Sequence, residues 1–477
     1  MDHYSAGTAA VSVLTPQATL GTPQAEAQTG LKRGAAGPLL LTGLGLSFIT
    51  VGNFVAWGFA LAQGGIGGLL IALGVVALLF FCLVACLGEL SAMMPSAGGA
   101  YVFVQRGLGP TAGLLAGAAI TLEYVCGTAA LAAFSASYLE SLTGFSGHGV
   151  TAILYFVVCL LNIAGVGEAL GVALLMAGVA IIGVLAAAAG MLPHATIANL
   201  VDVVPAAGHS VWLPFGLVGA WAAVPFVVSF FVTLEGVPFA AEEAKDPARS
   251  IPRAMFASLG IGSLLAVVVV VFCASGAGTH NLVGAPDPVV AALRNRGYVG
   301  GTDWLLLGVN FAAVAALVAS FFGGVFASSR MVFHLAREGF LPRLLARTNA
   351  RHAPWLAVLV AAGAAAILTY IGKAEQLVVL LVFGATTCYL LILASHWRLR
   401  RVAPEMPRPY RSPAGRFIPA LGMLLAALAF VACFLADIKW SMLGAALLLL
   451  SMLYFRVTGP TRAINHIPIN HIPKVTQ

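Results

Sequence analysis

The chain has 477 residues, of which 60% are hydrophobic and 9% are charged. Soluble chains carry about a quarter charged residues, so 24 basic and 17 acidic residues are too few to cover a soluble domain of this length. The mean hydropathy of +0.98 excludes intrinsic disorder for the bulk of the chain. The composition therefore predicts an all-α polytopic membrane protein.

The net charge of +7 does not indicate a nucleic-acid partner, because membrane proteins concentrate Lys and Arg in their cytoplasmic loops. The seven cysteines all fall in apolar stretches without metal-ligand spacing, which favours small buried side chains over a disulfide framework. We expect no cofactor and no resident metal. Residues 1–35 are polar and lack the apolar run of a signal peptide, so we expect a disordered cytoplasmic tail followed by an uncleaved first helix.

Apolar stretches of membrane-spanning length recur along the rest of the chain. A bilayer core of about 30 Å needs roughly 20 apolar residues per helix. Twelve stretches meet this requirement, at 38–62, 67–94, 110–138, 149–166, 168–192, 216–241, 254–276, 304–330, 355–372, 376–396, 417–436 and 438–456. Eleven or thirteen crossings are the neighbouring alternatives, since the junctions at 63–66 and 166–168 are short.

The basic residues predict the orientation. With both termini inside, 20 of the 24 Lys and Arg residues lie in cytoplasmic segments, and the remainder (Arg294, Arg296, Lys373 and Lys439) lie outside. The chain is thus predicted to be a multi-pass protein of a bacterial-type inner (plasma) membrane, N-in and C-in. The outside segment 277–303 is predicted to carry a short helix after Pro288. The tail 457–477 repeats an Ile-Asn-His-Ile-Pro unit, which favours an unstructured cytoplasmic tail over a metal site.

Two of the apolar stretches contain polar residues and glycine near mid-span. Helix 1 reads Thr50-Val51-Gly52-Asn53, and helix 6 reads Phe231-Val232-Thr233-Leu234-Glu235-Gly236 between two prolines. Helix interruptions in a membrane occur where they line a cavity, and transporters use them to bind substrate and ions. Because the two helices stand five apart and run in opposite directions, the matching breaks predict an inverted repeat of helices 1–5 and 6–10.

Acidic residues also lie within the predicted spans. Glu123 is near the middle of helix 3 and Glu235 is at the helix 6 break, where a central acid costs about 2.5–3.5 kcal/mol. No Lys or Arg in the membrane neutralises them, so each is protonated, hydrogen-bonded to a neighbouring helix, or matched by a cation from solution. We favour a substrate ammonium beside Glu235, with Phe231 as an aromatic neighbour. Glu89, one turn from the cytoplasmic end of helix 2, is expected to snorkel or to bond Ser91 and the loop, in a structural role.

Four cytoplasmic segments resemble signatures of the amino acid–polyamine–organocation (APC) superfamily of permeases. They are Glu89–Tyr101 with Arg106–Pro110, Glu235–Arg253, Ser329–Pro342 and Arg408–Pro413. The resemblance implies a five-plus-five inverted-repeat fold with two extra helices. The expected division is 36–192 for helices 1–5, 193–396 for helices 6–10, 397–456 for helices 11–12, and 457–477 for the tail.

Within the superfamily, the chain is most similar to ethanolamine permeases. Their helix 3 element matches Leu122-Glu123-Tyr124, and their helix 6 element matches Glu235–Val237 and Ala240–Glu243. Amino acid members bind the substrate carboxylate with a Gly-rich helix 1 break, and the bulky Val51 weakens such an anion site here. Ethanolamine permeases in turn carry Glu where this chain has Asn53. The sequence therefore predicts an importer of a small amine, ethanolamine first, with an amino acid permease as the alternative.

The resemblance also bears on gating and coupling. A cytoplasmic ion-pair lattice after helix 6 is predicted to control the inner gate, formed by Glu242, Glu243, Lys245, Asp246, Arg249 and Arg253. Helix 5 lacks the Lys of many proton-coupled members. A sodium site would need helix 8 hydroxyls such as Ser320, Ser328 and Ser329, and either membrane acid is an alternative proton carrier. Exchange or facilitated uptake stays open. An enzyme fits the sequence less well, because the histidines His148, His194, His209 and His280 lie in outside loops rather than in a convergent catalytic set. A channel also fits less well, and a nutrient sensor built on a transporter fold stays open.

Overall fold

The structure is a computed structural model that describes residues 37–94, 99–145, 147–164, 169–241, 244–298, 303–351 and 353–458. The predicted tail 1–35 lies outside the described residues, as do residues 459–477 of the predicted tail 457–477 and Glu242 and Glu243 of the predicted lattice. Every named element within the described ranges is helical, which agrees with the predicted fold class.

The longer helices follow the apolar stretches. In chain order the elements are α2 (Pro38–Ile49), η1 (Thr50–Asn53), α3 (Trp57–Met93), α4 (Gly99–Leu108), α5 (Pro110–Thr143), α6 (His148–Ala164), α7 (Ala169–Met191), η2 (Leu192–His194), α8 (Ile197–Leu200), α9 (Gly216–Ala222), α10 (Val224–Val228), η3 (Leu234–Ala240), α11 (Pro247–Ala277), η4 (His280–Leu282), α12 (Pro288–Asn295), α13 (Trp304–Arg337), η5 (Arg343–Ala346), α14 (Trp355–Ile371), α15 (Ala374–Val402), α16 (Phe417–Ala436) and α17 (Ile438–Thr458).

Seven of the described helices are long and apolar enough to cross a membrane. Four shorter apolar helices accompany them, at 38–53, 148–164, 355–371 and 438–454. The predicted stretch 216–241 is the exception, because the chain there forms α9, α10 and η3 rather than one continuous helix. Many large apolar side chains on the helix surfaces are exposed, as on α6 and α17, which suits a lipid environment.

The first two predicted helices join without a loop. Gly65 has φ 64° and ψ −171°, so α3 is two helical pieces that meet at a kink. A Cβ on Gly65 would lie 2.4 Å from Cγ of Pro214. The positive φ and this close approach together require glycine at the junction.

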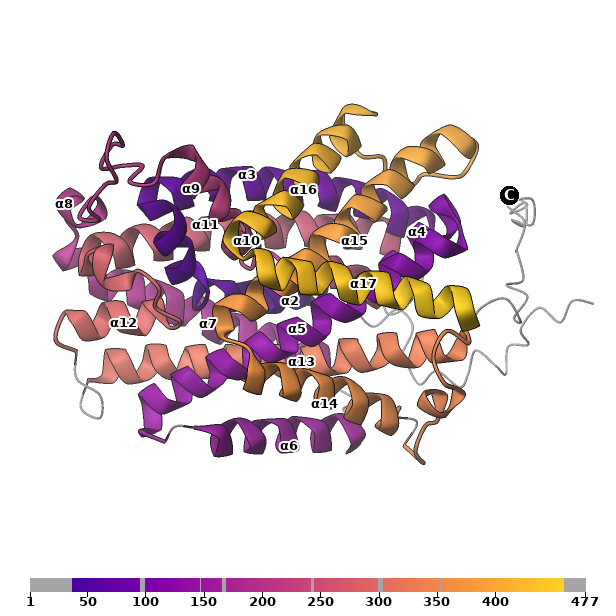
Figure 1. Cartoon of the computed structure of the whole chain (residues 1–477), viewed down its shortest axis with the longest axis horizontal. Helices are drawn as coiled ribbons and strands as arrows, with labels where there is room; N and C mark the ends of the chain where they lie inside the picture. The colour runs from indigo at the N-terminus through magenta and orange to yellow at the C-terminus, as the bar shows by residue number, and fades with distance from the viewer. Residues whose placement is uncertain are drawn as a thin grey trace, which may run out of the picture.

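The helices lie side by side with similar axial directions (Figure 1). The short helices α8 and α12 sit at one end of the bundle and α4 sits at the other, as expected for two sets of loops on opposite membrane faces (Figure 1). One group of helices comprises α2, α3, α10 and α11, and a second comprises α5, α13, α14 and α15. The site described below lies where the two groups meet.

The predicted short helix of the long loop is present as α12. Its apolar side chains are buried, including Val289, Val290 and Leu293. Just before it, the backbone N–H of Gly284 donates to the carbonyl of Gly58 at 2.8 Å. The loop is therefore attached to the start of α3, directly after the break in helix 1.

Candidate functional site

The first break interrupts the helix that begins at Pro38. The α-helix α2 ends at Ile49, η1 follows as a single 3-10 turn, and α3 starts at Trp57. Between them Ala56 has φ 68° and ψ −24°, a left-handed conformation that a residue with a Cβ rarely adopts. The predicted site residues Thr50, Val51, Gly52 and Asn53 make up the whole of η1, and all are buried.

The second break interrupts the stretch 216–241. Thr233 precedes η3 with φ 73° and ψ −2°, and its hydroxyl donates to the carbonyl of Val232 at 2.5 Å. For a β-branched residue this conformation is strained, at a cost of the order of 1–3 kcal/mol, and such strain collects at functional sites. Glu235 and Gly236 follow in η3. Each predicted break thus carries one non-glycine residue in the left-handed region.

The two breaks contact each other through their backbones. A Cβ on Gly52 would lie 2.5 Å from Cα of Phe230 and 2.7 Å from the carbonyl oxygen of Ser229. No side chain larger than hydrogen fits there without moving the backbone of the other break. Gly52, predicted as part of the substrate-binding break in helix 1, therefore also forms the contact between the two interrupted segments.

Two acidic side chains face each other beside this contact. Glu123 of α5 is 0% exposed and Glu235 of η3 is 3% exposed, and their carboxyl groups are close enough to interact. The hydroxyl of Tyr389 on α15 donates to Oε2 of Glu235 at 3.1 Å. Apart from the contact of the two carboxyl groups with each other, Oε1 of Glu235 and both oxygens of Glu123 accept no hydrogen bond from the described residues. The structure thus brings together two acids that lie 112 positions apart in the chain.

Backbone packing brings the surrounding elements close to this carboxyl pair. A Cβ on Gly384 of α15 would lie 2.9 Å from the backbone nitrogen of Glu123, so α15 and α5 approach at van der Waals distance. A Cβ on Gly236 would lie 3.1 Å from the ring of Phe48 and 3.5 Å from the hydroxyl oxygen of Tyr124. The pair is thereby enclosed by α2, α5, η3 and α15.

An aromatic wall stands next to the carboxyl pair. Phe231 is fully buried, and its ring centroid lies 5.4 Å from that of Phe80, which in turn lies 5.5 Å from that of Tyr389. Phe231, predicted as an aromatic neighbour of the acids, is thus separated from the tyrosine that donates to Glu235 by the single ring of Phe80. Trp221 of α9 points elsewhere, since it donates its indole N–H to the carbonyl of Leu428 on α16 at 2.8 Å.

The amide of Asn53 is partly unsatisfied. Its Nδ2 donates to the carbonyl of Thr50 at 3.1 Å, whereas Oδ1 has no partner among the described residues. Asn53 is 1% exposed, so this oxygen is a buried acceptor. Its own carbonyl accepts the indole N–H of Trp57 at 3.1 Å. The η1 turn therefore adds one further unused acceptor to the three on the carboxyl pair.

The serines predicted as sodium ligands lie on α13. Ser328 and Ser329 are buried and donate within α13, to Val325 at 3.1 Å and to Phe326 at 2.8 Å. The hydroxyl of Ser320 instead donates to the carbonyl of Ser47 on α2 at 3.4 Å.

The predicted gate lattice is described in part. Its described residues include an ion pair of Arg249 with Asp246 at 4.0 Å, between side chains that are 75% and 52% exposed.

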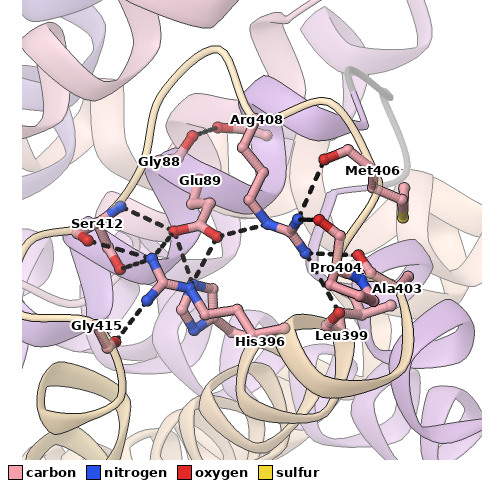
Figure 2. Close-up of polar contacts among 12 residues, drawn as sticks. Gly88, Glu89, His396, Leu399, Ala403, Pro404, Met406, Arg408, Ser412 and Gly415 are labelled. Carbon is pink, nitrogen blue, oxygen red and sulfur yellow. Dashed lines mark hydrogen bonds and ion pairs between the residues drawn. The ribbon is translucent and has the colours of Figure 1, made fainter.

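A third buried acid lies at the predicted cytoplasmic end of α3. Figure 2 shows Glu89 between Arg408, His396 and Ser412. Arg400 donates to both carboxyl oxygens of Glu89, at 3.0 and 2.5 Å. Arg408 adds a bond at 3.1 Å and the backbone N–H of Ser412 one at 2.8 Å. The expectation that Glu89 snorkels or bonds Ser91 is wrong, because the side chain is 0% exposed and Ser91 donates to Gly88.

Both arginines of this ion cluster also donate to backbone carbonyls. Arg408 donates to the carbonyls of Pro404, Met406, Leu399 and Ala403, and Arg400 donates to those of Gly415 and Ser412 (Figure 2). Burial, with nearby Cys86 and Glu89, raises the pKa of Tyr410 in the same loop to about 12, so its phenol stays neutral at ordinary pH. The cluster ties α3 to α15 and to the loop 403–416.

Sequence reasoning missed this ion cluster, although the signal was available. Glu89 opens one of the four family-like segments and Arg408 opens another. Two charged residues in separate signatures would have suggested a pair. Only the fold shows that the ends of α3 and α15 meet.

Comparison with known proteins places the chain in a family. Residues 40–464 match the family described as amino acid permease, which covers both breaks, the carboxyl pair and the ion cluster. The chain belongs to the amino acid permease family. This confirms the resemblance to the APC superfamily. It also identifies the chain as a multi-pass membrane permease rather than a member of an enzyme family.

Individual relatives have low sequence identity to this chain but align with most of it. A branched-chain amino acid permease of Bacillus subtilis (strain 168) is 25% identical over 81% of this chain and 84% of its own length. A methylthioribose transporter of the same organism is 26% identical over 81% and 85%. A general amino acid permease of Saccharomyces cerevisiae (strain ATCC 204508 / S288c) is 26% identical over 78% and 69%. These relatives are named for amino acids or methylthioribose, not for ethanolamine.

Proposed function

We propose that this permease imports an amino acid with an apolar side chain by alternating access, with the substrate held between the two breaks. The observation that carries the proposal is the group of unused acceptor oxygens on Glu123, Glu235 and Asn53, all nine-tenths or more buried. Buried acceptors without partners are rare and call for an explanation. A substrate ammonium offers three N–H donors as partners for these acceptor oxygens. It also supplies a positive charge next to the two acids.

The rest of an amino acid suits the same place. The aromatic wall of Phe231 and Phe80 offers an apolar surface to a branched or aromatic side chain. The substrate carboxylate would be received by backbone N–H groups where η1 gives way to α3, since interrupted helices present such groups to anions. Thr50, Val51, Gly52, Thr233 and Gly236 provide the backbone of this binding region. The names of the amino acid permeases among the relatives support this substrate class.

The proposal includes the predicted topology. Twelve crossings, both termini in the cytoplasm and a five-plus-five inverted repeat are supported by the twelve apolar stretches and the distribution of basic residues. The left-handed residues Ala56 and Thr233, one at each break, support the repeat. We further propose that the lattice of Lys245, Asp246, Arg249 and Arg253 with Glu242 and Glu243 acts at the inner gate. The proposed location is a bacterial-type inner membrane.

Ethanolamine is a second candidate substrate. Two buried acids and no described basic side chain at the breaks favour a ligand with an ammonium and no carboxylate. Val51 in η1 also leaves one glycine, rather than two, in the turn expected to receive a carboxylate. Under this candidate, the ethanolamine hydroxyl would bond Asn53 or Thr233.

Uptake into proteoliposomes separates the two candidates. Purified protein is reconstituted and tested with labelled L-leucine, L-isoleucine, L-valine and ethanolamine, each with and without imposed proton and sodium gradients. The proposal predicts saturable uptake of the branched-chain amino acids, with ethanolamine a poor competitor. Saturable ethanolamine uptake that excess L-leucine does not inhibit would establish the second candidate. A sodium requirement would direct attention to Ser328 and Ser329, and a proton requirement to the two acids.

A further inference from the structure

The segment that joins α15 to α16 carries more positive charge than its acids balance. Residues 397–416 contain six arginines and a single acid, Glu405. Two of the arginines, Arg400 and Arg408, are engaged by Glu89 and by backbone carbonyls. The four that remain are Arg398, Arg401, Arg411 and Arg416. All four are exposed, and none of them forms an ion pair within the described part of the chain.

Three of these four arginines lie around one anchor, the side chain of Arg400. Arg400 donates to the carbonyls of Ser412 at 3.2 Å and Gly415 at 2.7 Å, which fixes the turn between α15 and α16 (Figure 2). The next residues along the chain from Arg400, Ser412 and Gly415 are Arg401, Arg411 and Arg416. Consecutive Cα atoms are about 3.8 Å apart, so all three side chains start close to the anchor. We call these three residues the arginine site.

Aromatic residues place the arginine site at the predicted cytoplasmic boundary of the membrane. Trp397 directly follows the predicted span 376–396, and Phe417, which is 64% exposed, begins the predicted span 417–436. The guanidinium carbon of Arg401 lies 4.9 Å from the centre of the Trp397 ring. Tryptophan collects at membrane–water interfaces, at the level of the lipid headgroups. The arginine site is therefore expected at the level of the lipid phosphates.

We propose that the arginine site binds the headgroup of an anionic phospholipid of the cytoplasmic leaflet. Arginine offers paired N–H donors that match the oxygens of a phosphate. A bound phosphate also reduces the repulsion among three neighbouring guanidinium groups that have no described counter-ion. The exposed side chains of Val402 and Phe417 at the same boundary favour a lipid over a soluble phosphate, because they offer an apolar surface to the acyl chains. Lipid binding here is independent of which substrate is carried.

The test compares two lipids with the same acyl chains, phosphatidylglycerol and phosphatidylcholine. Each is titrated into the full-length protein after delipidation in a neutral detergent, and bound lipid is counted by native mass spectrometry. We expect the first phosphatidylglycerol to bind at least about tenfold more tightly than phosphatidylcholine, with a preference that shrinks as NaCl is raised. Equal binding of the two lipids would overturn the proposal. Glycerol 3-phosphate should bind far more weakly, and an affinity equal to that of phosphatidylglycerol would show a site for a soluble anion instead.

Two double variants locate the effect. Arg401→Gln with Arg411→Gln keeps Arg400 and Arg408, which hold the loop, and should reduce the preference for phosphatidylglycerol at least about tenfold. The control, Arg343→Gln with Arg347→Gln, removes the same charge from exposed positions at η5 and should keep the wild-type preference. Equal losses in both would mean that the whole cytoplasmic face attracts the lipid, which contradicts a built site.

The lipid preference of the wild-type protein does not depend on the folding of any variant. It is also measured without transport. Failure of the lipid experiment therefore leaves the proposed function intact, and absence of uptake of every candidate substrate leaves the lipid result to stand or fall by itself.

Discussion

Glu89 and Glu235 are both buried acids, at 0% and 3% exposed, but their surroundings are opposite. Glu89 accepts bonds from two arginines and a backbone N–H, and its arginines are in turn held by carbonyls. Glu235 and its neighbour Glu123 receive one phenol hydroxyl between them, and apart from their mutual contact their other three oxygens accept no hydrogen bond from the described residues. A satisfied buried charge holds elements together, whereas an unsatisfied one is retained for a ligand.

This comparison predicts opposite outcomes for the same chemical change. An acid-to-amide substitution should lower stability in the ion cluster, where it removes a needed charge. In the carboxyl pair it should lower transport while leaving stability unchanged or improved, because an uncompensated buried charge is removed. The predictions below test that contrast.

The largest effect is expected for Glu89→Gln. The substitution leaves Arg400 and Arg408 without their common anion, and breaking a buried ion pair on one side costs about 3–5 kcal/mol. We expect a clear fall in melting temperature in detergent, measured with a thiol-independent fluorescence assay. Glu140→Gln, on an exposed position, should change stability by less than about 0.5 kcal/mol. Equal melting temperatures for the two variants would show that the ion cluster adds nothing to stability.

Next is Glu235→Gln, which should reduce uptake about a hundredfold while the protein remains folded. The amide cannot supply the negative charge that an ammonium requires in a buried site, and a hundredfold loss corresponds to about 2.7 kcal/mol. Initial uptake rates in proteoliposomes, normalised to reconstituted protein, provide the measurement. Normal uptake by this variant would remove Glu235 from the substrate site.

Gly52→Ala tests the contact between the two breaks. Its new Cβ would lie 2.5 Å from Cα of Phe230, so the backbones must separate, and overpacking of this kind costs about 1–3 kcal/mol. We expect reduced thermal stability together with reduced uptake. Gly74→Ala is the matched control, since nothing lies within 4 Å of a Cβ at that position. If both variants behave alike, the close contact seen at Gly52 has no energetic weight.

Tyr389→Phe removes the hydrogen bond to Glu235 and little else. Hydrogen bonds to charged groups contribute about 1.5–3 kcal/mol, so we expect KM to rise about tenfold with stability largely preserved. Tyr155→Phe serves as the control, because it removes a comparable hydroxyl contact with Thr369, 2.9 Å long, on other helices. Unchanged KM in Tyr389→Phe would mean that the phenol does not position the carboxylate.

The smallest effect is expected for Arg249→Gln. Its ion pair with Asp246 spans 4.0 Å between exposed side chains, and exposed pairs contribute about 0–1 kcal/mol. The melting temperature should therefore stay within experimental error of the wild type, whatever the variant does to transport. A loss of stability as large as that of Glu89→Gln would place this pair in the structural class of the ion cluster.

The sequence was most informative about elements defined by local pattern. Apolar length predicted where the helices lie, and clusters of polar residues with Gly predicted both interruptions. The short helix α12 followed from an apolar run after Pro288. These features depend on residues that are close in the chain. For such a segment, the bilayer thickness and the need to pair every backbone hydrogen-bonding group leave few alternative conformations.

The partners of the charged residues required the fold. The sequence identified Glu123 and Glu235 as acids without a basic neighbour but did not show that they adjoin each other, and it assigned Glu89 the wrong surroundings. Each of these contacts joins residues more than 100 positions apart, so no local pattern encodes it.

The sequence by itself therefore determined a helical membrane permease with two interrupted helices and a few acids placed where charge is costly. The tertiary structure decided which of those acids is compensated. Helix packing brings two arginines to Glu89 and a second acid to Glu235, and a buried charge is stabilising or available for a ligand according to what the fold places beside it.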